Sequence, residues 1–300
     1  MGRFSNFIPY FLITSSFIPS VFPLSTTSSL LELHASDIAS LKNTASSVLS
    51  DPPTNDVFYL RYCLGYSDNN ERTSSLQSNL KWRNEIGKEI CDAATQALKT
   101  ATASEKFDNT PIRDGAPHAS TVNEFITPNQ IITTTSSAGD LVYCIRAGKI
   151  DDVALMSKLS EEQMVDFFLY CKEINSQVAD ERSIATDKLV RVITANDLSG
   201  VKLIGGDATF RNSLSAASKK ATELYPELSG PTLLLNLPPL VGALVKVFTP
   251  LFPPVVRKKI KFAKGVLSKG VELEDYLIGG KGRSAFEKDL QKLVYENGEW

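Results

Sequence analysis

Residues 225–260 read YPELSGPTLLLNLPPLVGALVKVFTPLFPPVVRKKI and combine apolar density, repeated proline and a basic end. The run from Leu228 to Val245 is uncharged and just long enough to be considered as a membrane-spanning helix. The pairs Gly230-Pro231 and Pro238-Pro239 would break such a helix twice and leave backbone groups unpaired in lipid. We therefore predict a strand over 232–237, a turn at the proline pair and then a helix.

A movable lid is one interpretation of the residues after the proline pair. The helix predicted from about residue 241 would present the apolar gate residues Leu244, Val247, Phe248 and Leu251. A second, basic amphipathic helix is predicted over 255–269. In it, Arg257, Lys258 and Lys261 would contact the membrane, since a basic residue near anionic lipid adds about 1 kcal/mol. A pair of core helices with a solvated basic face is the alternative.

The overall composition argues against several functions. Hydrophobic residues make up 42% and charged residues 22% of the chain, as in a globular protein with a buried core. The net charge of -2 gives no reason to expect nucleic acid as a partner. His34 and His118 are the two histidines, and both lie in segments that look poorly structured. We therefore predict no catalytic residues, no metal site and no cofactor.

The first 50 residues look like a targeting segment. No residue from Phe4 to Leu31 is charged, and the segment changes from apolar to rich in serine and threonine. The stretch SVFPLSTTSS, residues 20–29, resembles the phenylalanine-containing junction of bipartite plastid presequences. We predict that residues 1–50 lie outside the fold and direct the chain to a plastid or secretory route. A disordered tail on a cytoplasmic protein with transient membrane association is the alternative.

Hydrophobic periodicity divides the rest of the chain. Helical spacing over 53–100 predicts a helical N-terminal lobe, and the polar segment 101–138 predicts an irregular connection. Over 139–285, strand-like runs alternate with helical patterns, and a C-terminal helix or tail is expected over 286–300. The alternation predicts an α/β fold, with a mainly parallel sheet flanked by helices. The expected strands are 141–148, 188–200 and 231–238, and the expected helix caps are Ser160 with Gln163, and Asp207.

Several of these segments resemble the CRAL-TRIO lipid-binding family. The family carries YPE before a strand, then N-x-P, a phenylalanine–proline helix and a P-V segment that reaches a lysine. The matching residues here are 225–227, 236–238, 248–250 and 254–259. DLSG at 197–200 and YLIGGK at 276–281 are similar to further family motifs, so the resemblance extends over residues 55–285.

The resemblance implies a cavity that holds one lipophile beneath a hydrophobic gate helix. In members that bind phosphatidylinositol, a glutamate and a lysine hold the headgroup, and these match Glu227 and Lys259. Hydroxyls on the cavity strands serve a phosphatidylcholine mode, and Tyr143 and Thr194 match two of them. Val256 stands where phosphoinositide binders carry threonine, which leaves the identity of the lipid open.

A lipid carrier is the function that these features predict. The chain would bind a single phospholipid or other hydrophobic small molecule and transfer or present it at a membrane surface as a monomer. Phe167 and Phe210, on the apolar stripes of two predicted helices, are expected at the cavity or gate. A lipid-sensing module without net transfer is the first alternative. An α/β lipid-acting enzyme is the second, against which the missing G-x-S-x-G motif argues.

Overall fold

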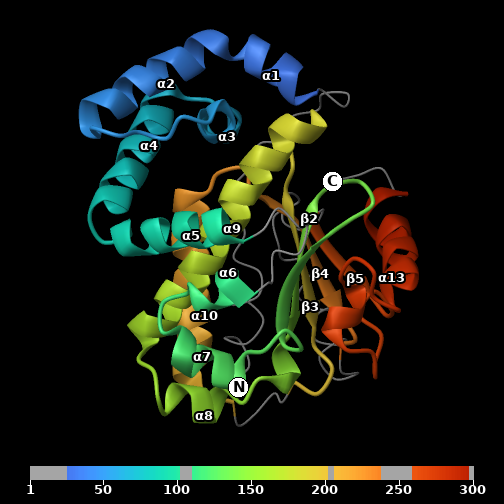
Figure 1. Ribbon diagram of the computed structural model, residues 1–300. Helices are drawn as coiled ribbons and strands as arrows, with labels where there is room; N and C mark the ends of the chain where they lie inside the picture. Colours follow the sequence, from blue (N-terminus) through green and yellow to red (C-terminus); the bar gives the residue numbers. More distant parts are fainter. Residues whose placement is uncertain (1–25, 102–109, 202–205, 238–258, 297–300) are drawn as a thin grey trace, which may run out of the picture.

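The computed structural model describes residues 26–101, 110–201, 206–237 and 259–296 (Figure 1). They form a five-stranded sheet with helices on both faces and a helical lobe at one end. Among these residues no helix has both the length and the apolar character needed to cross a membrane. The predicted α/β class with a mainly parallel sheet is confirmed.

The sheet follows the order of its strands in the chain. β1 is antiparallel to β2, whereas β2, β3, β4 and β5 are parallel to one another. The central strands are buried along nearly their whole length, as expected for a sheet covered on both faces. The bounds are Ile131–Thr135 for β1, Leu141–Arg146 for β2, Val192–Asp197 for β3, Ser229–Leu235 for β4 and Ile260–Ala263 for β5.

Two long helices connect the parallel strands and cover one face of the sheet. α9 (Glu161–Thr186) begins at Ser160, where the predicted capping box with Gln163 is present. α10 (Ala208–Leu224) begins at Asp207, whose side chain accepts a hydrogen bond from the backbone amide of Phe210. Short segments precede α9, namely η2 (Ala147–Lys149) and α8 (Asp152–Met156). Both predicted caps are therefore confirmed.

The C-terminal segment covers the opposite face of the sheet (Figure 1). Phe286, Leu290 and Val294 are at most 1% exposed and pack against strand residues such as Val142 and Leu233. This segment is therefore part of the core and more than a tail. Its elements are η4 (Leu273–Tyr276), α13 (Arg283–Leu290) and η5 (Gln291–Tyr295).

The N-terminal lobe begins earlier than predicted. Leu30, Ile38 and Leu41 are buried against the helices of the lobe, so the expectation that residues up to 50 lie outside the fold is wrong. Their apolar spacing is helical, but the many serines and threonines around them suggested a presequence. Residues 1–25 lie outside the described part, and their targeting role stays a prediction. The helices are α1 (Thr27–Leu33), α2 (Ala35–Val48), α3 (Asp56–Gly65), α4 (Asn69–Asn84) and α5 (Lys88–Thr100).

The predicted irregular connection contains regular structure. α6 (Thr110–Asp114) and α7 (Ala119–Phe125) precede β1, whose five residues IITTT are all buried. The run looks polar because of its threonines. Threonine is nevertheless β-branched, and pairing with β2 provides hydrogen bonds for its backbone.

β5 replaces part of the predicted basic helix. Residues 260–263 pair in parallel with Thr232–Leu235 of β4, so a helix over 255–269 is wrong at these positions. Ile260 and Phe262 alternate with Lys261 and Ala263, which is the period of a strand. The open edge of β4 offers backbone partners that a helix would leave unused. Residues 255–258 lie outside the described part.

Candidate functional site

A row of four hydroxyl side chains crosses the sheet on the face beneath α9 and α10. Thr133 of β1 aligns with Tyr143 of β2, Tyr143 with Thr194 of β3, and Thr194 with Thr232 of β4. Residues that align across a sheet point to the same side. Asn175 of α9 identifies that side, because its Oδ1 accepts a hydrogen bond of 3.1 Å from Thr133. Two predicted residues, Tyr143 and Thr194, are thus direct neighbours within this hydroxyl row.

The main cavity, of about 110 Å³, lies between the hydroxyl row and the two covering helices. Its walls come from β2, β3, β4, α9 and α10. The apolar part of the wall is formed by Ile145, Phe168, Leu214, Ala217, Ala221 and Leu228. The polar part includes Tyr143, Lys172, Thr194, Asn196, Ser229 and Thr232.

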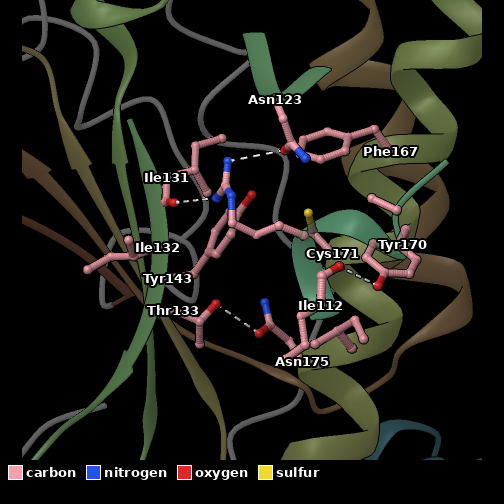
Figure 2. Close-up of a pocket in the computed structure, with 13 residues that line it drawn as sticks. Ile112, Asn123, Ile131, Ile132, Thr133, Tyr143, Phe167, Tyr170, Cys171 and Asn175 are labelled. Atoms are coloured by element: carbon pink, nitrogen blue, oxygen red, sulfur yellow. Dashed lines mark hydrogen bonds between the residues drawn. The ribbon is translucent and has the colours of Figure 1, made fainter. Parts of the chain in front are cut away.

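A smaller side cavity of about 50 Å³ lies between β1, α6 and α9 (Figure 2). Phe167 lines it, and Tyr143 belongs to the walls of both cavities. Figure 2 shows Asn175 pointing toward Thr133 at the edge of this space. Nδ2 of Asn175 is buried and has no hydrogen-bond partner among the described residues. This second space is therefore small and partly polar.

Lys172 brings a positive charge into the main cavity. Its Nζ lies 5.6 Å from the ring centroid of Tyr143, within the range of a cation–π contact. Burial lowers the pKa of the Lys172 ammonium below its usual value, because the charged form is poorly solvated there. The cavity thus combines apolar walls, hydroxyls and a desolvated cation.

Glu227 is held in place at the amino-terminal end of β4. Its φ of 54° is left-handed, a conformation that an ordinary residue adopts only when its surroundings fix it. Nη1 of Arg61 donates a 2.8 Å hydrogen bond to the Glu227 carbonyl, and Arg61 is itself paired with Asp180 at 2.6 Å. The Glu227 carboxylate accepts hydrogen bonds of 3.2 and 2.7 Å from Arg191. Backbone and side chain are therefore both fixed.

Lys259 lies at the same edge of the sheet as Glu227. Its Nζ donates a 3.3 Å hydrogen bond to the carbonyl of Ser229, two residues after Glu227. Burial lowers the pKa of Lys259, and the Glu227 carboxylate partly opposes that shift. The structure thus brings this predicted pair together.

The remaining predicted residues fall into three groups. Phe210 stacks edge-on against Phe168 at 6.0 Å in the core and lines neither cavity formed by the described residues. Lys261 aligns with Leu233, so it points to the sheet face opposite the hydroxyl row. The others lie outside the described residues, namely Leu244, Val247, Phe248, Leu251, Arg257 and Lys258.

Several polar residues of the site were not predicted from the sequence, among them Thr232, Asn196, Lys172 and Arg191. Thr232 and Asn196 are polar positions inside apolar strands; strand alternation from Thr194 could have identified Asn196, whereas Thr232 depends on the register of β4 against β3. Lys172 follows the buried Phe168 by four residues, which places it on the same side of the helix. Arg191 gave no signal, because its partner Glu227 is distant in the sequence.

One group in the N-terminal lobe has the composition of a metal site. His34, Asp37 and Cys63 place potential ligand atoms within 4.8 Å of one another, and His34 lies between two helices of the lobe, unlike the poorly structured position that we predicted. The Asp37 carboxylate already accepts a 2.9 Å contact from Arg72. Burial raises the pKa of Cys63 to about 11, so the thiol stays protonated at neutral pH. The ion pair between Asp37 and Arg72 therefore accounts for this cluster.

Comparison with known proteins identifies the family. Residues 129–278, half of the chain, match the model of the CRAL/TRIO domain. The crystal structure of Sfh5 is similar over 81% of each chain, with 16% sequence identity and a TM-score of 0.45. No curated protein matches the sequence. The matched segment contains all five strands and every strand residue that lines the main cavity, and the chain therefore belongs to the CRAL-TRIO family of lipid-binding proteins.

Proposed function

We propose that this protein binds one phospholipid or other lipophile beneath α9 and α10 and transfers or presents it at membranes. The main cavity carries this proposal, because it combines an apolar wall with polar side chains that lack protein partners. Thr194, Thr232 and Asn196 make no side-chain hydrogen bond to another described residue. Thr232 and Asn196 are buried and Thr194 is partly buried, and buried polar groups are normally satisfied, so a ligand with a polar end is a natural partner for them.

The size of the main cavity adds a requirement. Pockets for small molecules usually measure about 300–1,000 Å³, and the described residues enclose about 110 Å³. A lipid with two acyl chains therefore needs a larger space than this wall encloses. The proposal accordingly includes an enlargement of the cavity when the lipid enters.

The energetics explain why a carrier is useful. Two acyl chains hold on the order of 30 methylenes, and exposing them to water costs about 20 kcal/mol or more at ~0.8 kcal/mol each. Spontaneous transfer between membranes is slow against that barrier. An apolar cavity removes most of this cost because both the bilayer and the cavity solvate the chains without water.

Transfer between vesicles tests the proposal. The protein is mixed with donor vesicles of phosphatidylcholine that contain fluorescent phosphatidylcholine or phosphatidylinositol, and with unlabelled acceptor vesicles. We expect the rate of transfer to rise in proportion to protein concentration. Binding without any such rise would favour the alternative of a lipid-sensing module. If the protein neither bound nor transferred lipid, the proposed function would be wrong.

Replacement of Lys259 by alanine tests the proposed headgroup pair. If Lys259 and Glu227 hold an inositol phosphate, Lys259→Ala should lower phosphatidylinositol transfer about tenfold, the value of one charge-assisted contact. Lys264→Ala, which removes an exposed lysine of the same segment, should transfer at the wild-type rate. Equal rates for both variants would show that the headgroup does not use Lys259.

A further inference from the structure

The charge on the wall of the main cavity is unbalanced. Lys172 is the one charged side chain among the described residues that line this cavity, and no carboxylate faces it there. Two cations of the N-terminal lobe that reach α9 each have a carboxylate partner. Arg61 contacts Asp180 at 2.6 Å and Arg83 contacts Glu173 at 2.7 Å. Lys172, which is partly buried, is thus a cavity cation to which the described part of the protein supplies no anion.

The surroundings of Lys172 raise the cost of that arrangement. Its contact among the described residues is the face of the Tyr143 ring, and it makes no hydrogen bond or ion pair with them. An ammonium at a partly buried position without an anion is costly, because the apolar wall replaces part of its hydration shell. Methionine would fill the same space at lower cost, so a lysine at this position indicates that a charge is needed.

Hydrogen-bonding groups surround the same space. Thr232 and Asn196 are 5% and 3% exposed, and their side chains have no hydrogen-bond partner among the described residues. Thr194 lies on β3, two residues before Asn196 and directly opposite Thr232 of β4. Hydroxyl and amide groups can donate to an anion, so the charge and the donors belong to one site.

We propose that Lys172, with the hydroxyls and amide opposite it, binds an anionic group of the lipophile, a carboxylate or a phosphate. This rests on the proposed function and names the class of ligand. A volume of about 110 Å³ corresponds to a few water molecules, which is enough for such a group and too little for acyl chains. The anionic end therefore lies inside the cavity against the sheet, with the chains directed away from it.

The edge pair is a different place for a headgroup. The Glu227 carboxylate accepts from Arg191, and Lys259 donates to the Ser229 carbonyl. A headgroup at that edge has to compete with these contacts. An anion beside Lys172 displaces no interaction between described residues, which makes the inner position the more favourable one.

Two ligand series distinguish the carboxylate from the phosphate. The first compares an 18-carbon fluorescent polyene fatty acid with its methyl ester, by titration into wild-type protein and Lys172→Met. The second incubates the proteins with vesicles that contain equal parts of phosphatidic acid, phosphatidylcholine, phosphatidylinositol and diacylglycerol. Native mass spectrometry then identifies the bound lipid.

Lys219→Met is the matched control, since Lys219 is an exposed lysine of α10. Lys172→Gln repeats the test with a polar side chain in case the methionine variant does not fold.

A charge-assisted contact predicts a preference of about 10- to 100-fold for the anionic ligand over its neutral counterpart. We expect wild type and Lys219→Met to show this preference in one of the two series, and Lys172→Met to reduce it to less than about threefold. The series in which Lys172→Met loses the preference for the anionic ligand identifies that ligand as a carboxylate or a phosphate. A wild-type protein without preference in either series, or a preference that survives in both Lys172 variants, would overturn the inference. Tight binding of neutral ligands would then leave the proposed function intact, whereas failure to bind any ligand would contradict both.

Discussion

Replacing Arg83 with methionine is expected to lower the free energy of unfolding by about 3–5 kcal/mol. Arg83 of α4 donates hydrogen bonds of 2.9 and 2.7 Å to the two carboxylate oxygens of Glu173 on α9. Glu173 is 0% exposed, so the single variant leaves a buried carboxylate without its cation. This pair joins the N-terminal lobe to the domain that holds the cavity. Urea unfolding monitored by circular dichroism measures the loss.

The double variant Arg83→Met/Glu173→Leu separates the pair from its parts. Replacing both charges with apolar side chains should restore much of the stability, because no charge is then buried alone. Lys88→Ala, which removes an exposed i,i+4 pair with Asp92, should leave the urea midpoint unchanged. A single Arg83→Met variant as stable as wild type would show that the two parts of the chain are joined in another way.

The same pair predicts how stability depends on pH. The largest opposing contributions to the Glu173 pKa are burial, which raises it, and Arg83, which lowers it, and the net direction is downward. The stabilisation is therefore present above the ordinary glutamate pKa of about 4.3 and is lost as the pH falls through the lower folded value. Arg83→Met should reduce this loss of stability in acid, as measured by urea unfolding between pH 7 and 3.

Replacing Phe286 with alanine is the second change with a large expected effect, about 3–5 kcal/mol. Phe286 is 1% exposed, and its ring lies 5.2 Å from that of Tyr276 on the sheet face away from the main cavity. Deleting the ring leaves a void in this packed layer. Thermal and urea unfolding measure the effect, and Ile278→Ala, at a residue 40% exposed, is the control with a small effect. A small loss for Phe286→Ala would mean that the C-terminal segment does not support the sheet.

The parts of the fold that were predicted correctly have strong local signals. β3 and β4 are continuous apolar runs, and α9 and α10 begin at side-chain caps. β1 and β5 were missed because a strand at the edge of a sheet is shorter and more polar, and its neighbour in space decides its structure. α1 and α2 were missed for a similar reason, since their apolar residues become a core only when α3 and α4 cover them.

The candidate site was predictable only in part. The resemblance named Tyr143 and Thr194, and strand alternation from Thr194 would have added Asn196. The pairing of Arg191 with Glu227 depends on the register of β3 against β4, which no local pattern contains. Lys172 could be placed on the inner side of its helix, yet the absence of a carboxylate opposite it is a property of the assembled cavity.

Native mass spectrometry of the purified protein tests the central claim, that one lipid lies beneath α9 and α10, most directly. Ala217→Phe places a ring in the main cavity, whereas Ala216→Phe places the same ring on the exposed side of α10. We predict that wild type and Ala216→Phe carry one lipid per chain after incubation with mixed phospholipid vesicles, and that Ala217→Phe carries none while it stays folded. A wild-type protein that carries no lipid, or an Ala217→Phe variant that carries as much as wild type, would contradict the account.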